Sequence, residues 1–407
     1  MIVKILSKGE LVTSGYIRFE NGKVNLHFMD NMNKKFFSEI GLGARSFKPS
    51  DGLEYMNAVV TAFLLSTAIV LVEEEQDKEW RSVKLLPKMK NYKADINERY
   101  WEYQKSQFST GQSFFERPYV QDGRPPVFIR HEAWRNVIIN PFASQQETHR
   151  LLALIPKEER HRWFGSMNSS QALAQSIFGN LAIHSSLECL SEMKDDEGID
   201  LFGKAQISSD NFKMEKKIDY LGEPRQTSLD GYISGDYQIA IECKFTEAEV
   251  GSCSRPQLTA KDSNYESDYC DGTYSVQKTR KTRCSLAERK ILYWRYVPQL
   301  LKWTIDSDLN PCPMKKNYQL IRNILAAGVK PDGTASVNNG HALLIYDERN
   351  PAFQQGGKGM IAYTETRTAL QETTMLRKCS WQRIVQRIRE NNILSWLSES
   401  LALKYGM

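Results

Sequence analysis

Residues 227–247 read TSLDGYISGDYQIAIECKFTE, and this stretch predicts a β-hairpin. In its second half, apolar residues alternate with Ala240, Glu242 and Lys244, which is the period of two that is typical of a strand with one buried face. The Ser-Gly-Asp sequence at 234–236 supplies a turn between the two halves. Asp230 on the first strand is therefore expected on the same side of the hairpin as Glu242 and Lys244.

Two carboxylates and a lysine in this arrangement suit the hydrolysis of a phosphodiester bond. Mg²⁺ is held in proteins by one or two carboxylates together with water and phosphate oxygens, and it generates hydroxide near neutral pH. Asp230 and Glu242 are the expected metal ligands, with the carbonyl oxygen of Cys243 as a further one, and Mn²⁺ is expected to substitute for Mg²⁺. Lys244 can orient or activate the attacking water, or stabilise developing negative charge as a fixed cation.

The order Asp230, eleven intervening residues, then Glu242-Cys243-Lys244 resembles the motif of the PD-(D/E)XK nuclease superfamily, which has the restriction-endonuclease-like fold. The resemblance covers roughly residues 165–390, and Leu229 stands where the motif is named for proline. It implies an α/β protein with a mixed β-sheet flanked by helices, and a metal-dependent DNA nuclease. Members often add an acid from the leading helix and a glutamine from the helix after the hairpin. The resemblance therefore implies catalytic roles for Glu188 and Gln319.

The length of 407 residues predicts two or three domains. Residues 1–95 are predicted to form a small α+β domain, with an Asn-Gly hairpin signal at 21–22 and a helix after Pro49. Residues 96–165 are interpreted as a helical connecting region and 166–407 as the nuclease-like domain. In the latter, helices are predicted at 171–181, 276–297 and 318–327 and from Ser380 onward, with Pro298 interrupting the second. Strands are predicted at 212–221, 342–346 and 375–379, besides the hairpin.

The charge of the chain permits nucleic-acid binding without proving it. Lys and Arg total 54 against 49 Asp and Glu, a net charge of +5. Basic residues gather in two places, a stretch at 278–302 that also holds Tyr293, Trp294 and Tyr296, and a C-terminal group made up of Arg377, Lys378, Arg383, Arg387 and Arg389. Cations neutralise phosphates and aromatic rings stack on bases. The alternative is a pair of ordinary amphipathic helices whose aromatic residues belong to the core. DNA contact is expected for at least one of the two.

The seven cysteines are an odd number, and the N-terminus lacks the pattern of a secretory signal. Both features favour a reducing cytoplasm with free thiols. Cys253, Cys270, Cys284 and Cys312 all follow the hairpin but form no CxxC pair, so zinc or an iron–sulfur cluster is not expected at these four residues. The longest uncharged run, 56–72, is too short and too polar for a membrane span. No phosphate-binding loop is present, so ATP-driven chemistry would require a partner chain.

The expected function is a Mg²⁺-dependent DNA endonuclease. A cytoplasmic nuclease with an extra N-terminal domain would suit a restriction or anti-phage defence system. Two alternatives stay open at this point. One is a non-catalytic nucleic-acid or protein-binding module on the same fold, and the other is a recombination or transposition nuclease that acts with partner subunits. Partner proteins and an oligomer are both compatible with the sequence.

Overall fold

The computed structural model divides the chain into two compact units, Met1–Lys90 and Asn91–Met407. The structure describes residues 2–7, 10–20, 23–28, 68–73, 80–82, 92–108, 112–117, 124–223, 226–253, 286, 290–303 and 312–407, the ranges up to 82 as backbone alone. Residues 96–165, expected to form a separate connecting region, lie within the second unit.

The first unit contains a five-stranded antiparallel sheet in the order β3-β2-β1-β4-β5. Its strands are β1 (Ile2–Ser7), β2 (Glu10–Glu20), β3 (Lys23–Phe28), β4 (Ala68–Glu73) and β5 (Trp80–Ser82). Glu20 pairs with Lys23, which leaves a two-residue connection at the Asn-Gly sequence. The helix predicted after Pro49 lies outside the described residues.

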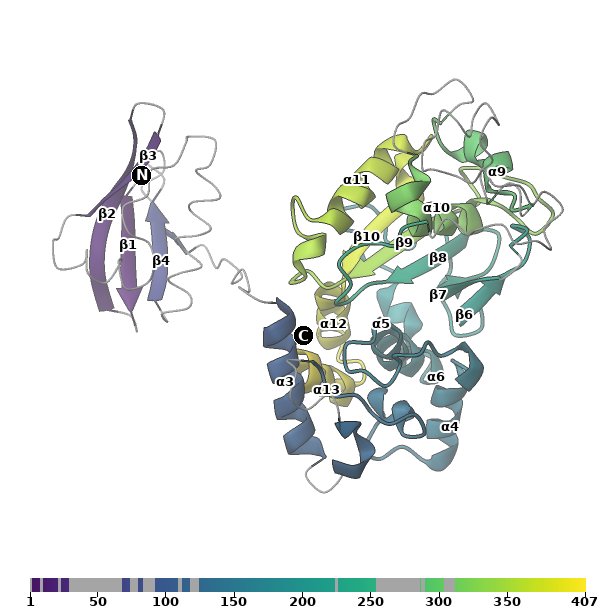
Figure 1. The fold of residues 1–407 in the computed structure, drawn as a ribbon, viewed down its shortest axis with the longest axis horizontal. Coiled ribbons are helices and arrows are strands. Elements are labelled where there is room, and N and C mark those ends of the chain that lie inside the picture. Colours follow the sequence, from purple (N-terminus) through teal and green to yellow (C-terminus); the bar gives the residue numbers. More distant parts are fainter. Residues whose placement is uncertain are drawn as a thin grey trace. The chain divides into compact units, whose positions relative to one another are not determined.

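The second unit is built on a mixed five-stranded sheet in the order β10-β9-β8-β7-β6. Its strands are β6 (Phe212–Ile218), β7 (Thr227–Ile233), β8 (Gln238–Cys243), β9 (Gly340–Tyr346) and β10 (Leu376–Ser380). Strands β6, β7 and β8 form an antiparallel meander, whereas β9 and β10 are parallel to β8. The predicted α/β class with a mixed sheet and flanking helices is confirmed (Figure 1).

The helices surround this sheet, and Figure 1 shows α10 on one side of it and α5 and α6 on the other. The α-helices are α3 (Tyr92–Gln107), α4 (Gln145–Ala153), α5 (Ser170–Ala174), α6 (Asn180–Ile183), α9 (Tyr293–Leu300), α10 (Met314–Gly328), α11 (Lys358–Ala369), α12 (Trp381–Glu390) and α13 (Ser395–Tyr405). Short 3₁₀ turns are η2 (Gln112–Phe114), η4 (Ala133–Asn136), η5 (Lys157–Glu159), η7 (Leu187–Leu190), η8 (Pro351–Phe353) and η9 (Thr373–Met375), and η6 (Gln175–Gly179) is a π-helix.

The helix predicted at 171–181 is present as the continuous run α5, η6 and α6. It begins after Ser169, whose hydroxyl accepts a hydrogen bond from the amide of Ala172 at 3.1 Å. This N-cap satisfies one of the amide groups that a helix leaves without a partner in its first turn. Ser380 caps α12 in the same way, as predicted, by accepting from the amide of Arg383 at 3.3 Å.

Strand β8 is buried at every position, so the prediction of a single buried face is wrong for it. The strand lies in the middle of the sheet, and both α5 and α10 contact it. A central strand with helices on both sides excludes water from both faces. The alternation of residue types still separates the two faces, because Ala240 packs in the core beneath α10 and Glu242 contacts the same helix.

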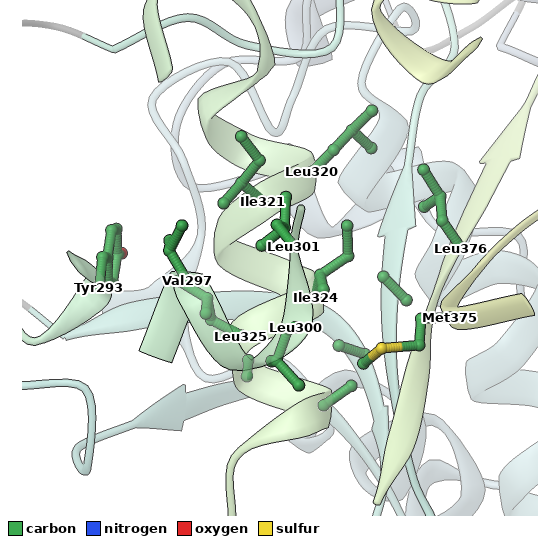
Figure 2. Packing of buried hydrophobic residues seen from close by; sticks show 14 of the residues in the cluster. Tyr293, Val297, Leu300, Leu301, Leu320, Ile321, Ile324, Leu325, Met375 and Leu376 are labelled. Carbon is green, nitrogen blue, oxygen red and sulfur yellow. The ribbon is translucent and has the colours of Figure 1, made fainter. Parts of the chain in front are cut away.

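Helices α9 and α10 pack their apolar residues against each other and against the sheet (Figure 2). Tyr293, Val297 and Leu300 of α9 are fully buried there. Pro298 lies inside α9, so the prediction that it interrupts a helix at 297 is wrong. Burial of the residues on either side holds this short helix together across the missing backbone donor. Residues 290–292 of the predicted basic helix precede α9 and are not helical, so the predicted bounds are wrong there. Residues 276–285 and 287–289 lie outside the described residues.

Candidate active site

Asp230 and Glu242 occupy facing positions on β7 and β8. The antiparallel register pairs Tyr232 with Ala240 and Gly231 with Ile241, so the next step along both strands brings Asp230 opposite Glu242. The paired residues end at Gly231 and Ile241, and beyond them the backbone amide of Cys243 donates to Oδ2 of Asp230 at 2.7 Å. The side chain of Asp230 therefore takes a hydrogen bond from β8, which holds its carboxylate close to the backbone of the Glu-x-Lys sequence.

Lys244 continues the same face one step beyond the end of β8. Its amide donates to the carbonyl of Ile345 at 2.7 Å, and its own carbonyl accepts from the indole of Trp381 at 3.0 Å. Its Nζ lies 2.8 Å from Oε1 of Glu242, with only 9% and 4% of the two side chains exposed. Glu242 and Lys244 therefore form a buried ion pair, which differs from a solvated pair because neither charge is screened by water.

Helix α10 supplies two amide side chains to this ion pair. Nζ of Lys244 donates to Oε1 of Gln319 at 2.9 Å, and Nδ2 of Asn323 donates to Oε2 of Glu242 at 2.7 Å. The two residues are four positions apart, so they lie on the same face of the helix. The structure therefore brings the sequence-predicted Gln319 to Lys244. It adds Asn323, which the i, i+4 spacing from Gln319 could have indicated.

Gly251 fixes the place of Gln319. The amide of Gln319 donates to the carbonyl of Gly251 at 3.3 Å. A Cβ atom at Gly251 would lie 2.2 Å from Oε1 and 3.1 Å from Cβ of Gln319, and the glycine has φ +110°. Only glycine adopts such a φ readily, and only glycine leaves room for the glutamine side chain.

A third carboxylate, Glu215, joins the site from β6. The register pairs Met214 with Gly231 and Lys216 with Leu229, so Glu215 lies across from Asp230. Glu215 itself is left out of the paired residues and has a left-handed φ of 47°. Such a φ is strained for a residue other than glycine and is found preferentially at functional sites. Three neighbouring strands therefore present Glu215, Asp230 and Glu242 in one row.

Hydrogen bonds hold Glu215 in place. The hydroxyl of Ser228 donates to its Oε2, and Nε2 of Gln171 in α5 donates to its Oε1. The sequence prediction missed this residue, because Glu215 stands in a lysine-rich stretch and carries no motif. The only available signal was the pairing of β6 with β7, and the sequence did not specify that register.

The row of carboxylates carries more negative charge than its surroundings neutralise. Burial, and then the charges of Glu242 and Glu215, raise the pKa of Asp230 well above its ordinary value. Burial also raises the pKa of Glu215, and Glu242 adds to that shift. Burial alone would lower the pKa of Lys244, but the carboxylates of Glu242 and Glu247 outweigh it and the pKa is raised. Lys244 is therefore a cation at neutral pH, whereas Asp230 and Glu215 keep their protons to a higher pH than ordinary carboxyl groups do.

These residues fit a hard divalent cation such as Mg²⁺. Asp230 and Glu242 offer carboxylate oxygens, and two carboxylates are enough for an ion that also binds water and phosphate. Within the described part of the chain, the second oxygen of Asp230 accepts no hydrogen bond, and the buried Oδ1 of Asn323 has no partner. Among those same residues no group of three or more His, Cys, Asp or Glu has the arrangement of a complete metal site.

The structure places the other sequence-predicted residues outside this arrangement or on its edge. Glu188 lies on η7 with an exposed side chain, and no hydrogen bond or ion pair between described residues joins it to Asp230, Glu242 or Lys244. Cys243 has a fully buried thiol, whose pKa is raised first by burial and then by Asp230. Its backbone amide binds Asp230, and its carbonyl oxygen remains a predicted ligand.

No metal was expected from the sequence at four cysteines, and the structure describes two of them. Cys253 is partly buried and Cys312 is buried. Cys270 and Cys284 lie outside the described residues. Among the helices that the structure describes, none is both long and apolar enough to cross a membrane.

A mixed sheet that carries Asp on one hairpin strand and Glu-x-Lys on the next defines the class of restriction-endonuclease-like proteins. A family model described as "Restriction Endonuclease associating with ARP" matches residues 87–406, and the chain belongs to this family. The predicted resemblance to restriction-endonuclease-like nucleases is confirmed at this level. The match begins close to the division between the two compact units. No curated protein and no solved structure matches the chain.

Proposed function

We propose that this protein is a Mg²⁺-dependent endonuclease that hydrolyses phosphodiester bonds in DNA. The observation that carries the proposal is the row formed by Glu215, Asp230 and Glu242 beside the buried ammonium of Lys244. A buried cluster with this excess of negative charge destabilises the metal-free protein, and binding a divalent cation would relieve the repulsion. The family supports a nuclease role.

Each residue has a separate part in the proposed mechanism. Asp230 and Glu242 would hold Mg²⁺, which supplies an activated water and neutralises the scissile phosphate. Lys244 remains protonated and donates to Glu242 and Gln319, so its third N–H is available for the attacking water or a phosphate oxygen. Gln319 and Asn323 are positioning residues, because they fix the side chains of Lys244 and Glu242.

Cleavage of plasmid and linear DNA by the full chain tests the proposal. Wild type is expected to cut in Mg²⁺ or Mn²⁺ and not in EDTA, and Lys244→Ala and Asp230→Asn are expected to lose at least about 100-fold in rate. Asp236→Asn is the matched control, because Asp236 is exposed in the turn of the same hairpin. Equal rates for wild type, Lys244→Ala and Asp230→Asn would remove these residues from the mechanism.

The DNA cleavage rates of Glu215→Gln and Glu188→Gln show which of the two residues is the third acid of the site. We place Glu215 in the site because it faces Asp230. Its charge also raises the pKa of Asp230, although burial and Glu242 have larger effects on that pKa. The first variant is therefore expected to reduce the cleavage rate much more than the second. A larger loss in Glu188→Gln would assign the role to the exposed acid that the superfamily resemblance implied.

The description of the family also names a partner, ARP. Because its members are described as associating with ARP, we propose that this chain acts in the cytoplasm with such a partner, in restriction or anti-phage defence. Copurification of the two proteins and plating of phage on cells that express both test this setting. DNA binding that persists in EDTA, with no cleavage under any divalent cation or with the partner, would favour a non-catalytic module. Cleavage that requires the partner and joins DNA ends would favour a recombination nuclease.

A further inference from the structure

Two adjoining hollows lie beside the candidate active site, and together they form what we call the basic groove. The larger has a volume of about 740 Å³ and the smaller of about 420 Å³, and both are lined by Val127, His161 and Trp163. The smaller hollow is also lined by Thr246 and Glu247, which follow Lys244 by two and three positions. The groove therefore leads away from the end of the strand that carries Glu242 and Lys244.

The larger hollow is strongly basic. Arg130, Lys157 and Arg162 line it with exposed side chains, and Glu116 is the one acid among the described residues that line it. Among the described residues, no ion pair joins any of these three cations to a carboxylate. Cations in this state keep their full charge for an external anion.

Arg160 in the same wall behaves differently. Its guanidinium donates to the carbonyls of Leu152 and Ile155, at 3.0 and 3.2 Å, and lies over the ring of Phe164. Arg160 therefore shapes the wall of the groove from within the protein. Arg130, Lys157 and Arg162, in contrast, line the hollow with exposed side chains.

The C-terminal basic group is one of the two stretches in which a DNA contact was expected from the sequence. Its side chains instead form ion pairs and hydrogen bonds within the protein. Lys378 and Arg383 both pair with Asp196, and Arg387 pairs with Glu192. Arg377 donates to the carbonyl of Asp200, and Arg389 donates to carbonyls near the C-terminus. Tyr293 and Tyr296 of the other basic stretch are buried in the core and do not present rings to a base, and Trp303, which follows that stretch, is buried as well.

Trp163 gives the groove an aromatic surface. Its side chain is 45% exposed, and the guanidinium of Arg162 lies 5.2 Å from its ring centre. Cations beside an exposed indole suit a nucleic-acid strand, because phosphates meet the cations while a sugar or base packs on the ring. A small free anion would not require an aromatic wall or a groove that continues toward a second site.

We propose that the basic groove holds the DNA strand that extends from the scissile phosphate, with Arg130, Lys157 and Arg162 bound to its phosphates. The assignment rests on the proposed nuclease function and adds a substrate-binding surface to it. It also gives residues 124–165 a role, although the sequence suggested only a connecting region there. The path begins at Thr246 and Glu247 and continues over Trp163 to the three cations.

Binding of fluorescein-labelled DNA to the full chain in Ca²⁺ tests the groove, with anisotropy measured across a salt series. The Arg130→Gln/Lys157→Gln/Arg162→Gln variant is expected to bind at least about tenfold more weakly. Its salt slope should be smaller by about 2 to 3, because each lost phosphate contact contributes about 0.9. The matched control removes the same charge from exposed lysines elsewhere, as Lys93→Gln/Lys204→Gln/Lys358→Gln, and is expected to bind like wild type.

The outcomes separate the groove from the nuclease proposal. Wild-type cleavage together with unchanged binding and slope in the groove variant would overturn the groove alone. Equal weakening in the control would show a general charge effect and would also overturn it. Wild type that neither binds nor cuts DNA would overturn both proposals, and groove-dependent binding of only the matching RNA would reassign the groove to RNA. Thermal melts of all variants, with Lys157→Gln as a single substitution, exclude unfolding as the cause of a loss.

Discussion

Oε1 of Gln319 lies 2.9 Å from Nζ of Lys244, although 75 positions of sequence separate the two residues. This contact joins helix α10 to the strand end that carries the proposed catalytic lysine. It also depends on Gly251, which packs directly against the glutamine side chain. The position of Lys244 therefore depends on Gln319 from a distant helix and, through Gln319, on Gly251.

Gly251→Ala is expected to reduce DNA cleavage by at least about tenfold, since a displacement of about 1 Å at a reacting group costs more than that. The new methyl group would lie 2.2 Å from Oε1 of Gln319 and would push it away from Lys244. Steady-state cleavage rates in Mg²⁺ measure the effect.

Gly198→Ala is the control for this substitution. Gly198 also has a positive φ, +81°, but a Cβ atom there would meet nothing within 4 Å. Both variants should lose similar stability from backbone strain, and only Gly251→Ala should lose cleavage. Similar rates for the two variants would show that Gln319 does not position Lys244.

Asp230→Asn is expected to stabilise the metal-free protein while it abolishes cleavage. Burial, and then Glu242 and Glu215, raise the pKa of Asp230, so its charged form costs free energy in the folded state. Asparagine keeps an oxygen that can accept from the amide of Cys243 and carries no charge. Urea unfolding in EDTA at pH 7.5 should show a gain on the order of 1 kcal/mol.

The sign of this effect fixes its pH dependence. A carboxyl group whose pKa is raised in the folded state makes the protein less stable as the pH rises above the pKa of that group in the unfolded chain. The gain in stability from Asp230→Asn should therefore vanish near pH 4. Asp236→Asn, in the exposed turn, should change the free energy of unfolding by less than about 0.5 kcal/mol at either pH. A destabilised Asp230→Asn protein at pH 7.5 would contradict the assigned repulsion.

Divalent metal binding is expected to release protons and to strengthen with pH. The raised pKa values of Asp230 and Glu215 mean that protons compete with the cation for the carboxylates. Calorimetric titration with Mn²⁺ at pH 6.5, in two buffers of different ionisation enthalpy, measures the number of protons released. Asp230→Asn should release fewer. Proton-free, pH-independent binding by wild type would exclude these residues as the metal site.

Lys404 is expected to make stability rise with pH above neutrality. Its side chain in α13 is fully buried, and burial lowers its pKa to about 7, although Nζ donates to two oxygens of Asn136. Between pH 7 and the ordinary lysine pKa, the unfolded chain binds more protons than the folded one, so raising the pH favours folding. The stability of wild type relative to Lys404→Met should increase by about 2 kcal/mol from pH 7 to pH 9.

Urea unfolding at both pH values measures this difference. The Lys358→Met control replaces an exposed lysine on α11, and its difference from wild type should stay constant. The other titrating groups cancel in each comparison, because they are common to wild type and variant. A constant difference for Lys404→Met would show that the buried amine is neutral in both states or charged in both.

Local patterns predicted much of the fold. The alternation in 238–245 located β8, the Ser-Gly-Asp turn located the hairpin, and Ser169 and Ser380 marked the starts of two helices. These signals depend on residues close in sequence, so they can be read without the rest of the chain. Pro298 was misjudged, because the burial of α9 against α10 outweighs the local preference of proline.

The sequence by itself determined the α/β class, the hairpin and the facing positions of Asp230, Glu242 and Lys244, since a period of two and a short turn fix which side chains share a face. Only the tertiary structure decided which further residues join them. Glu215 enters through the register of β6, Gln319 and Asn323 through the packing of α10, and the basic groove through residues 124–170 folded beside the strand end. Such contacts depend on packing between distant segments, which no local pattern encodes.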